Sequence, residues 1–238
     1  MGINFPKITL DRTIEILSNV IKQSRSQLFH VITVNPEITM ACQKDRTLRS
    51  IVDEAGLVTA DGIGIVMVSR LRGGNLPERV TGYDILLKLL VSGNQKKWSF
   101  YFLGADPVIN QKVCEVIDEK YPDLIIVGKH HGFFKQHEED KIVEEIASLK
   151  PDILVVALGA PYAEKWIHKH KSKLNAKIAI GVGGSLDVIA GKVKATPESW
   201  KRLNLEWLYR LLQQPSRWKR QLILPRFAIR ALLFREGK

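Results

Sequence analysis

LVTADGIG, residues 57–64, is an apolar strand pattern that ends in the carboxylate of Asp61 and continues at once into two glycines and a helical apolar pattern. A similar stretch, FHVITVNP at residues 29–36, ends in the amide of Asn35. The carboxyl ends of parallel strands meet at one edge of a sheet, where open α/β folds bind ligands. We therefore expect Asp61 and Asn35 to face a shared crevice.

Short β-branched apolar runs alternate with amphipathic segments along most of the chain. The runs expected to form strands are roughly 28–34, 56–60, 98–103, 124–128, 152–158 and 177–182. Apolar residues recur at helical spacing over 10–21, 85–91, 108–117 and 142–149. This alternation predicts an α/β, Rossmann-like fold, in which helices cover both faces of a parallel sheet.

The C-terminal part of the chain has a different charge balance from the rest. The 238 residues carry a net charge of +11, and from Lys194 onward 11 basic residues stand against 3 acidic ones. We expect an α/β domain over 1–194 and a basic amphipathic appendage over 195–238. Such an appendage suits a phosphate-rich partner, whether a nucleic acid, an anionic lipid surface or a diphosphate substrate.

The appendage pattern predicts two helical segments. A helix from about 197 to 213 would start with Thr196 as its N-cap and end before Pro215. The segment 217–234 interleaves apolar and basic residues, which is typical of a helix lying in a membrane interface. The alternative is a helix that packs its leucines on the body and leaves its arginines in solvent. Exposed leucines would also favour self-association into a homo-oligomer.

Other sequence features indicate where in the cell the protein is located. No apolar run approaches the ~18 residues that span a bilayer, and the N-terminus lacks a basic segment followed by an apolar one. Cys42 and Cys114 have no disulfide or zinc-ligand spacing. We expect a cytoplasmic protein that is peripheral on the inner face of the cell membrane.

Each polar residue near the predicted crevice also has an ordinary structural interpretation. Asp61 and Asn35 both precede helical patterns and would serve as N-caps, and Thr81 with Asp84 fits a capping box. Arg79 lies in a loop rich in glycine and proline, from which a guanidinium could reach a phosphate. The capping and ligand-binding interpretations both stay open at this stage.

Small residues end several predicted strands and would let a ligand approach the backbone closely. They are Gly104, Gly159, Gly181, Gly183, Gly184 and Ser185. A helix beginning near Ser185 would direct free N–H groups at an anion. The loop matches neither Gly-x-Gly-x-x-Gly nor a Walker lysine motif, and no Asp-x-Asp pattern is present. We expect a nucleoside diphosphate rather than a dinucleotide, with no metal and no cofactor.

Seven motifs in a fixed order resemble the WecG/TagA/CpsF family of bacterial glycosyltransferases, glycosyltransferase family 26. They are Thr33-x-Asn35-x-Glu37, Asp61-Gly62-x-Gly64, Arg79-x-Thr81-Gly82-x-Asp84, Gly132-Phe133-Phe134, Leu158-Gly159-x-Pro161-x-x-Glu164-Lys165-Trp166, Gly181-Val182-Gly183-Gly184-Ser185-x-Asp187 and Leu205-Glu206-Trp207-x-x-Arg210-Leu211. Each is weak alone, but the ordered set covers nearly the whole chain. The resemblance is greatest to the TagA branch, whose members transfer N-acetylmannosamine from its UDP derivative to undecaprenyl-diphosphate-linked N-acetylglucosamine in wall teichoic acid synthesis.

The resemblance implies a role for several residues. Asp61 matches the family's proposed general base, Thr33 and Asn35 match residues of the acceptor-sugar pocket, and Arg79 matches a residue near the donor diphosphate. The positions that match basic residues of the family's appendage, thought to complete the active site at the membrane, are Arg210, Arg217 and Arg220. The implied partners are a UDP-sugar donor, a lipid-linked acceptor and an anionic membrane surface, with no nucleic acid.

One position departs from the family pattern. Ala163 stands where the family usually has Gln in Pro-x-Gln-Glu-x-Trp, so any polar contact of that Gln is missing or supplied otherwise. This keeps a non-catalytic UDP-binding subunit open. Transfer of N-acetylmannosaminuronic acid or glucose stays open as well, and so does a nucleic-acid-binding protein that uses the basic tail.

Overall fold

A computed structural model describes residues 2–23, 27–215, 218 and 222–234. The described residues form one parallel sheet of six strands in the order β2-β1-β6-β5-β3-β4. The strands are β1 (Phe29–Val34), β2 (Leu57–Ala60), β3 (Ser99–Gly104), β4 (Ile125–His130), β5 (Ile153–Ala157) and β6 (Ile178–Gly181). All six lie where the apolar runs predict them, so the α/β Rossmann-like fold is confirmed.

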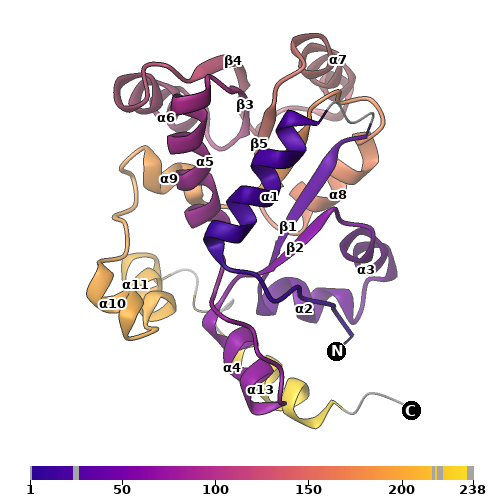
Figure 1. Ribbon diagram of the computed structural model, residues 1–238, viewed down its shortest axis with the longest axis vertical. Helices are drawn as coiled ribbons and strands as arrows, with labels where there is room; N and C mark the ends of the chain where they lie inside the picture. The colour runs from indigo at the N-terminus through magenta and orange to yellow at the C-terminus, as the bar shows by residue number, and fades with distance from the viewer. Residues whose placement is uncertain (1, 24–26, 216–217, 219–221, 235–238) are drawn as a thin grey trace.

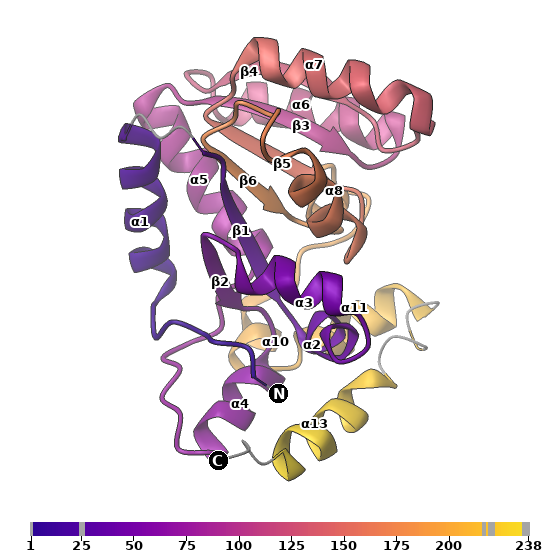
Figure 2. The same ribbon diagram turned by 90° about the vertical axis from the view of Figure 1, so that its right-hand side faces the viewer.

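Helices cover both faces of this sheet, as the alternation predicts. One face packs against α1 (Leu10–Lys22), α5 (Gly82–Lys96), α6 (Pro107–Lys120) and α9 (Ser185–Ile189). The other packs against α2 (Pro36–Cys42), α3 (Arg46–Asp53), α4 (Ile63–Leu71), α7 (Glu139–Leu149) and α8 (Tyr162–His170). Figure 2 shows α1 and α5 on one side of the sheet and α3 and α8 on the other.

Side-chain alternation along the strands divides the core between the two faces. In β1, Val31 joins the cluster under α1 and α5, whereas Ile32 and Val34 join the cluster under α2 and α3. Successive side chains of a strand point to opposite faces, so a strand covered on both sides is apolar at most positions, with His30 and Thr33 the polar exceptions in β1. This is why the strands lack a polar alternation and why their ends, where the chain leaves the core, carry the polar groups.

The appendage begins with two short helices, α10 (Glu198–Arg202) and α11 (Glu206–Gln213). The prediction of one continuous helix over 197–213 is therefore wrong, and Pro197 rather than Thr196 is the N-cap of α10. Asn204 breaks the helix, because its φ of 60° is left-handed, a conformation that Asn tolerates better than most residues. The break lets α11 turn so that Glu206 and Arg210 reach the body.

The last helix, α13 (Ile223–Leu233), packs against α2 and α4 at the lower end of the molecule in Figure 1. Phe227 and Ala231 are buried there, in the same apolar cluster as Ile38 and Val66. Other apolar side chains of α13 remain exposed, Leu232 and Leu233 among them. This segment therefore packs one face on the body, though not through these leucines, and its position in a membrane interface stays a prediction.

Candidate active site

A cleft of 480 Å³ lies at the carboxyl edge of the sheet, between the ends of β1, β2, β5 and β6 and the start of α5. Of the residues predicted for the site, those lining it are Thr33, Asn35, Asp61, Gly159, Gly181, Gly183, Gly184, Ser185 and Arg210. They come from segments as far apart as the first strand and α11. The shared crevice expected from the two strand-end motifs is therefore present.

Asp61 follows β2 directly and is held by backbone bonds on two sides. Its N–H donates to the Val34 carbonyl at 2.8 Å, and the Gly82 N–H donates to its carboxylate. Asp61 does not cap α4, because the N-cap there is Gly62 and makes no side-chain capping bond. The capping interpretation of Asp61 is thus wrong, and its carboxylate faces the cleft.

The surroundings of Asp61 shift its pKa toward neutrality. Burial raises the pKa of Asp61 to about 6; the nearby Arg210 and Arg79 oppose this shift, and Glu206 adds to it. A base that works at neutral pH is most effective when its pKa lies close to that pH. Asp61 therefore combines access to the cleft with the proton affinity that a general base needs.

Asn35, Thr33 and Thr81 line the cleft close to Asp61. The Asn35 Oδ1 accepts from the Ile38 N–H at 2.9 Å, so the predicted N-cap of α2 is confirmed. The Thr81 hydroxyl accepts from the Asp84 N–H at 3.0 Å, which confirms that helix start as well. Capping occupies one atom of Asn35 and holds the rest of its amide at the cleft, so both interpretations of Asn35 are compatible.

Arg79 and Arg210 are joined through a carboxylate of the appendage. Glu206, only 8% exposed, lies 2.6 Å from the Arg79 Nη1 and 2.6 Å from the Arg210 Nη2. Arg210 lines the cleft, whereas Arg79 is not among the described residues that line it. Arg79 thus holds α11 against the body and acts on Asp61 through its charge.

The glycine-rich loop after β6 lines the cleft and leads directly into α9. Gly183 has a φ of 52°, a conformation that side chains disfavour, and it has open space around it. The Ser185 N–H and hydroxyl both donate to the Val182 carbonyl, at 3.1 and 2.6 Å. The predicted helix start near Ser185 is confirmed, because α9 begins there, but the Ser185 N–H itself is used within the turn.

Gly104 has a packing role. Its φ is 119°, and a Cβ there would lie 2.5 Å from the Ala157 backbone, so only glycine lets β3 end this close to β5. It is not among the described lining residues of the cleft. Arg217 and Arg220 lie outside the residues that the structure describes.

Sequence reasoning assigned no role to Glu164, which also lines the cleft. Its side chain is 4% exposed, and burial raises its pKa to about 7. The signal for it was an acid in the first turn of α8, the helix that follows β5 and Gly159. The neighbouring Ala163 is buried in the apolar core beside Trp166, and it makes no polar side-chain contact.

The described residues show neither a cluster of metal ligands nor a membrane-spanning helix. No group of three or more His, Cys, Asp or Glu side chains in the described part of the chain is arranged to hold a metal ion. Over the same residues, no helix has the length and apolar character needed to cross a bilayer.

Comparisons with known proteins match this sequence to a family. The sequence model of the glycosyl transferase WecG/TagA/CpsF family matches residues 1–237. A Bacillus subtilis (strain 168) protein named N-acetylglucosaminyldiphosphoundecaprenol N-acetyl-beta-D-mannosaminyltransferase is 39% identical over 208 residues, 87% of this chain and 80% of the relative. A Staphylococcus aureus (strain MRSA252) protein of the same name is 31% identical over 221 residues, 92% of this chain and 85% of the relative.

Proposed function

The chain belongs to the WecG/TagA/CpsF family of glycosyl transferases, and we propose that it moves N-acetylmannosamine from UDP-N-acetylmannosamine to undecaprenyl-diphosphate-linked N-acetylglucosamine. The observation that carries this proposal is Asp61, a carboxyl with a pKa of about 6 at the cleft, beside the guanidinium of Arg210. One group suits proton removal from an acceptor hydroxyl, and the other suits a diphosphate.

In the proposed reaction, an acceptor hydroxyl attacks the anomeric carbon from the side opposite UDP. The new C–O bond forms as the bond to the diphosphate breaks, and the hydroxyl proton passes to the Asp61 carboxylate. The electron pair of the broken bond leaves on UDP, whose growing charge is stabilised by Arg210 and the backbone of the Gly181–Ser185 loop. Direct displacement inverts the anomeric carbon, so an α-linked donor gives a β product.

A donor panel tests the proposal. The full-length protein is incubated with a short-chain diphosphate-linked N-acetylglucosamine and, separately, UDP-N-acetylmannosamine, UDP-N-acetylmannosaminuronic acid and UDP-glucose, with product detected by mass. We expect the disaccharide only with the first donor. Transfer of N-acetylmannosaminuronic acid or glucose instead would reassign the donor, and no product with any donor supports a non-catalytic subunit.

We also propose that the end of the molecule formed by α4 and α13 rests on an anionic membrane. Its exposed apolar side chains are Met67, Leu71, Ile229, Leu232 and Leu233, and its exposed cations are Arg70, Arg72, Arg226 and Arg230. Apolar area and basic charge act together at an anionic lipid surface. The Arg72 Nη1 donates to the Ala231 carbonyl at 2.9 Å, which joins the two helices into one surface.

Liposome flotation tests the membrane proposal with surface variants. Removing α13 would also strip Phe227 and Ala231 from the core, so a truncation would test folding instead. We expect Leu232→Asp with Leu233→Asp to reduce flotation with anionic vesicles about tenfold or more, because both side chains lose contact with lipid and add negative charge. Val108→Asp, on the exposed start of α6, is the matched control and should float like wild type. Equal flotation of all three proteins would refute the proposal.

A further inference from the structure

Glu164 lies in the first turn of α8 and reaches the cleft beneath the end of β6. A Cβ placed on Gly181 would lie 2.9 Å from the Glu164 Oε1, so the carboxyl is pressed against the first residue of the glycine-rich loop. The side chain is 4% exposed and also lines the cleft. It is therefore a buried carboxyl at the cleft, on the opposite side of the central strands from α5.

The hydrogen bonding of Glu164 is incomplete. The Oε2 has no hydrogen-bond partner among the described residues, while the carboxyl interacts with the N–H of Glu164 itself. A purely structural acid at a helix N-terminus normally satisfies both of its oxygens, and an unsatisfied buried polar atom calls for an explanation. Its place at the cleft supplies one, because a bound molecule can provide the missing partner.

The charges around Glu164 differ from those around Asp61. Asp61 feels two guanidiniums, whereas no described cation forms an ion pair with Glu164, and its neighbour Lys165 is held 2.5 Å from Asp45. The other titratable groups facing the cleft are Glu37, Tyr83, Asp187 and Arg210. A buried carboxyl without a counter-ion favours its neutral form, and a bound diphosphate adds further negative charge.

We propose that Glu164 contacts substrate as a neutral acid and donates a hydrogen bond to an uncharged oxygen, a hydroxyl or an acetamido carbonyl, of the donor sugar. The inference rests on the proposed function. The glycine-rich loop that faces the donor diphosphate begins at Gly181, against which Glu164 packs, so the sugar that follows the diphosphate lies within its reach. The two carboxyls thus have different roles: Asp61 accepts a proton, whereas Glu164 stays protonated and donates a hydrogen bond.

Three proteins test this role: wild type, Glu164→Gln and Glu164→Ala. Glutamine keeps the shape and an N–H donor without titrating, so we expect kcat/KM for the UDP-sugar to stay within about threefold of wild type at pH 6. Alanine removes the donor, and we expect a loss of about 5- to 150-fold, the range of one hydrogen bond to a buried group. Above about pH 7, wild-type kcat/KM should fall as Glu164 ionises, while the glutamine variant should stay level.

Calorimetric binding of UDP and of UDP-N-acetylmannosamine separates this inference from the proposed function, because it needs no turnover. We expect Glu164→Ala to weaken binding of the UDP-sugar but not of UDP. Equal weakening of both ligands, or unchanged binding of both, would overturn the contact with the sugar. Glutamine and alanine variants with equal losses would overturn the neutral acid. An inactive wild type whose UDP-sugar affinity still depends on Glu164 would refute only the proposed function. Melting temperatures of all three proteins check that each is folded.

Discussion

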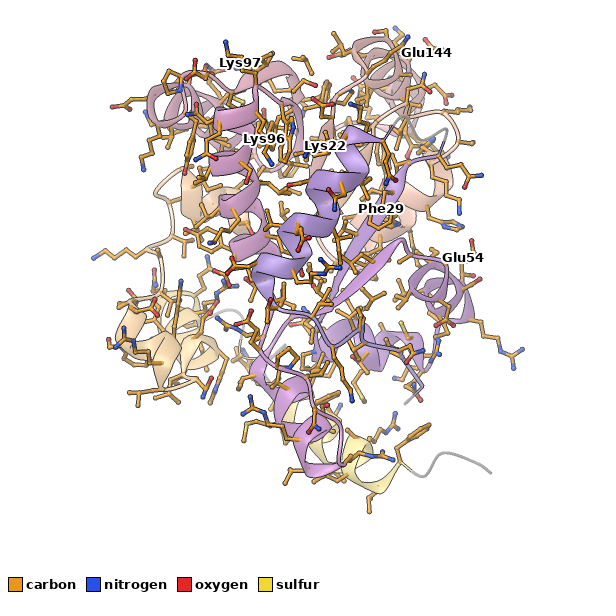
Figure 3. The ribbon with its side chains drawn as sticks, in the orientation of Figure 1. Lys22, Phe29, Glu54, Lys96, Lys97 and Glu144 are labelled. Carbon is orange, nitrogen blue, oxygen red and sulfur yellow. The ribbon has the colours of Figure 1, made fainter. Side chains whose placement is uncertain are left out.

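The two ends of the sheet both have a hollow, and the larger one lies at the end away from Asp61. At the amino edge of β1, a hollow of 750 Å³ is lined by Phe29, His30, Glu54, His168 and Lys171. Figure 3 labels Phe29 at the start of β1 and Glu54 just after α3, at that end of the molecule. The carboxyl-edge cleft has only 480 Å³.

The two ends differ in the direction in which burial shifts the pKa values of their groups. At the amino edge, Lys171 pairs with Glu54 at 3.3 Å, and burial, helped by His168 and Lys171, lowers the pKa of His30 to about 3. At the carboxyl edge, burial raises the pKa of two carboxyls toward neutrality instead. Among the described groups of these two ends whose pKa is shifted, those raised toward neutrality lie at the second end, so the direction of the pKa shift rather than hollow size indicates the site.

The largest expected effect is at Asp61. Asp61→Asn should lower turnover about 10²-fold or more, because the acceptor hydroxyl loses its base. It should also raise the melting temperature at pH 8 relative to wild type. The native pKa of Asp61 lies above its unfolded value of 3.8, so stability falls as pH rises from 3.8 to about 6, and the whole cost is present at pH 8.

His30→Gln, at the other end of the sheet, is the matched control for the assay of Asp61→Asn. It should keep wild-type turnover at pH 7.5, measured with the same donor and acceptor. Near-normal turnover of Asp61→Asn would remove the proposed base, and an equal loss in His30→Gln would erase the functional difference between the two ends.

A smaller effect is expected at Glu206, which joins Arg79 to Arg210. Glu206→Gln should destabilise the fold by about 1–3 kcal/mol in urea unfolding, because two guanidiniums lose a shared charged partner. Glu206 also raises the pKa of Asp61, so the acid limb of the kcat/KM profile should move to lower pH in the variant. Glu198→Gln, at an exposed position on α10, serves as control. An acid limb that moves to higher pH would contradict the assignment.

The smallest expected effect is on folding stability at acidic pH, and it comes from His30. Because the native pKa of His30 is lowered, the unfolded chain binds the extra proton, and stability should fall as pH drops from about 6.5 toward about 3. His30→Gln should flatten this part of the stability curve, measured by urea unfolding at pH 4, 5 and 7. A variant curve parallel to that of wild type would show that His30 is not buried as a neutral ring.

Particular residues show how far the sequence could predict this site. Asn35 and Asp61 were found because they follow apolar strands, and a strand end is visible in the order of residues. Thr33 lies inside β1 and was named through the family resemblance. Glu164 lies farther from its strand, in the first turn of the helix that follows β5, and nothing in the sequence shows that its oxygen lacks a partner. Gly104 looked equivalent to the site glycines, and only its 2.5 Å approach to Ala157 separates it from them.

The sequence by itself determined the strands, their parallel arrangement and the edge that carries the polar groups, because side-chain periodicity and strand ends are local properties of the chain. The tertiary structure alone decided that Glu206 of the appendage joins Arg79 to Arg210, and that Asn204 turns α11 toward the cleft. It also decided that one carboxyl at the cleft, Asp61, has arginines nearby, whereas no described cation forms an ion pair with the other, Glu164. Proton affinity depends on burial and on charges brought together from distant segments, and these exist only once the chain has folded.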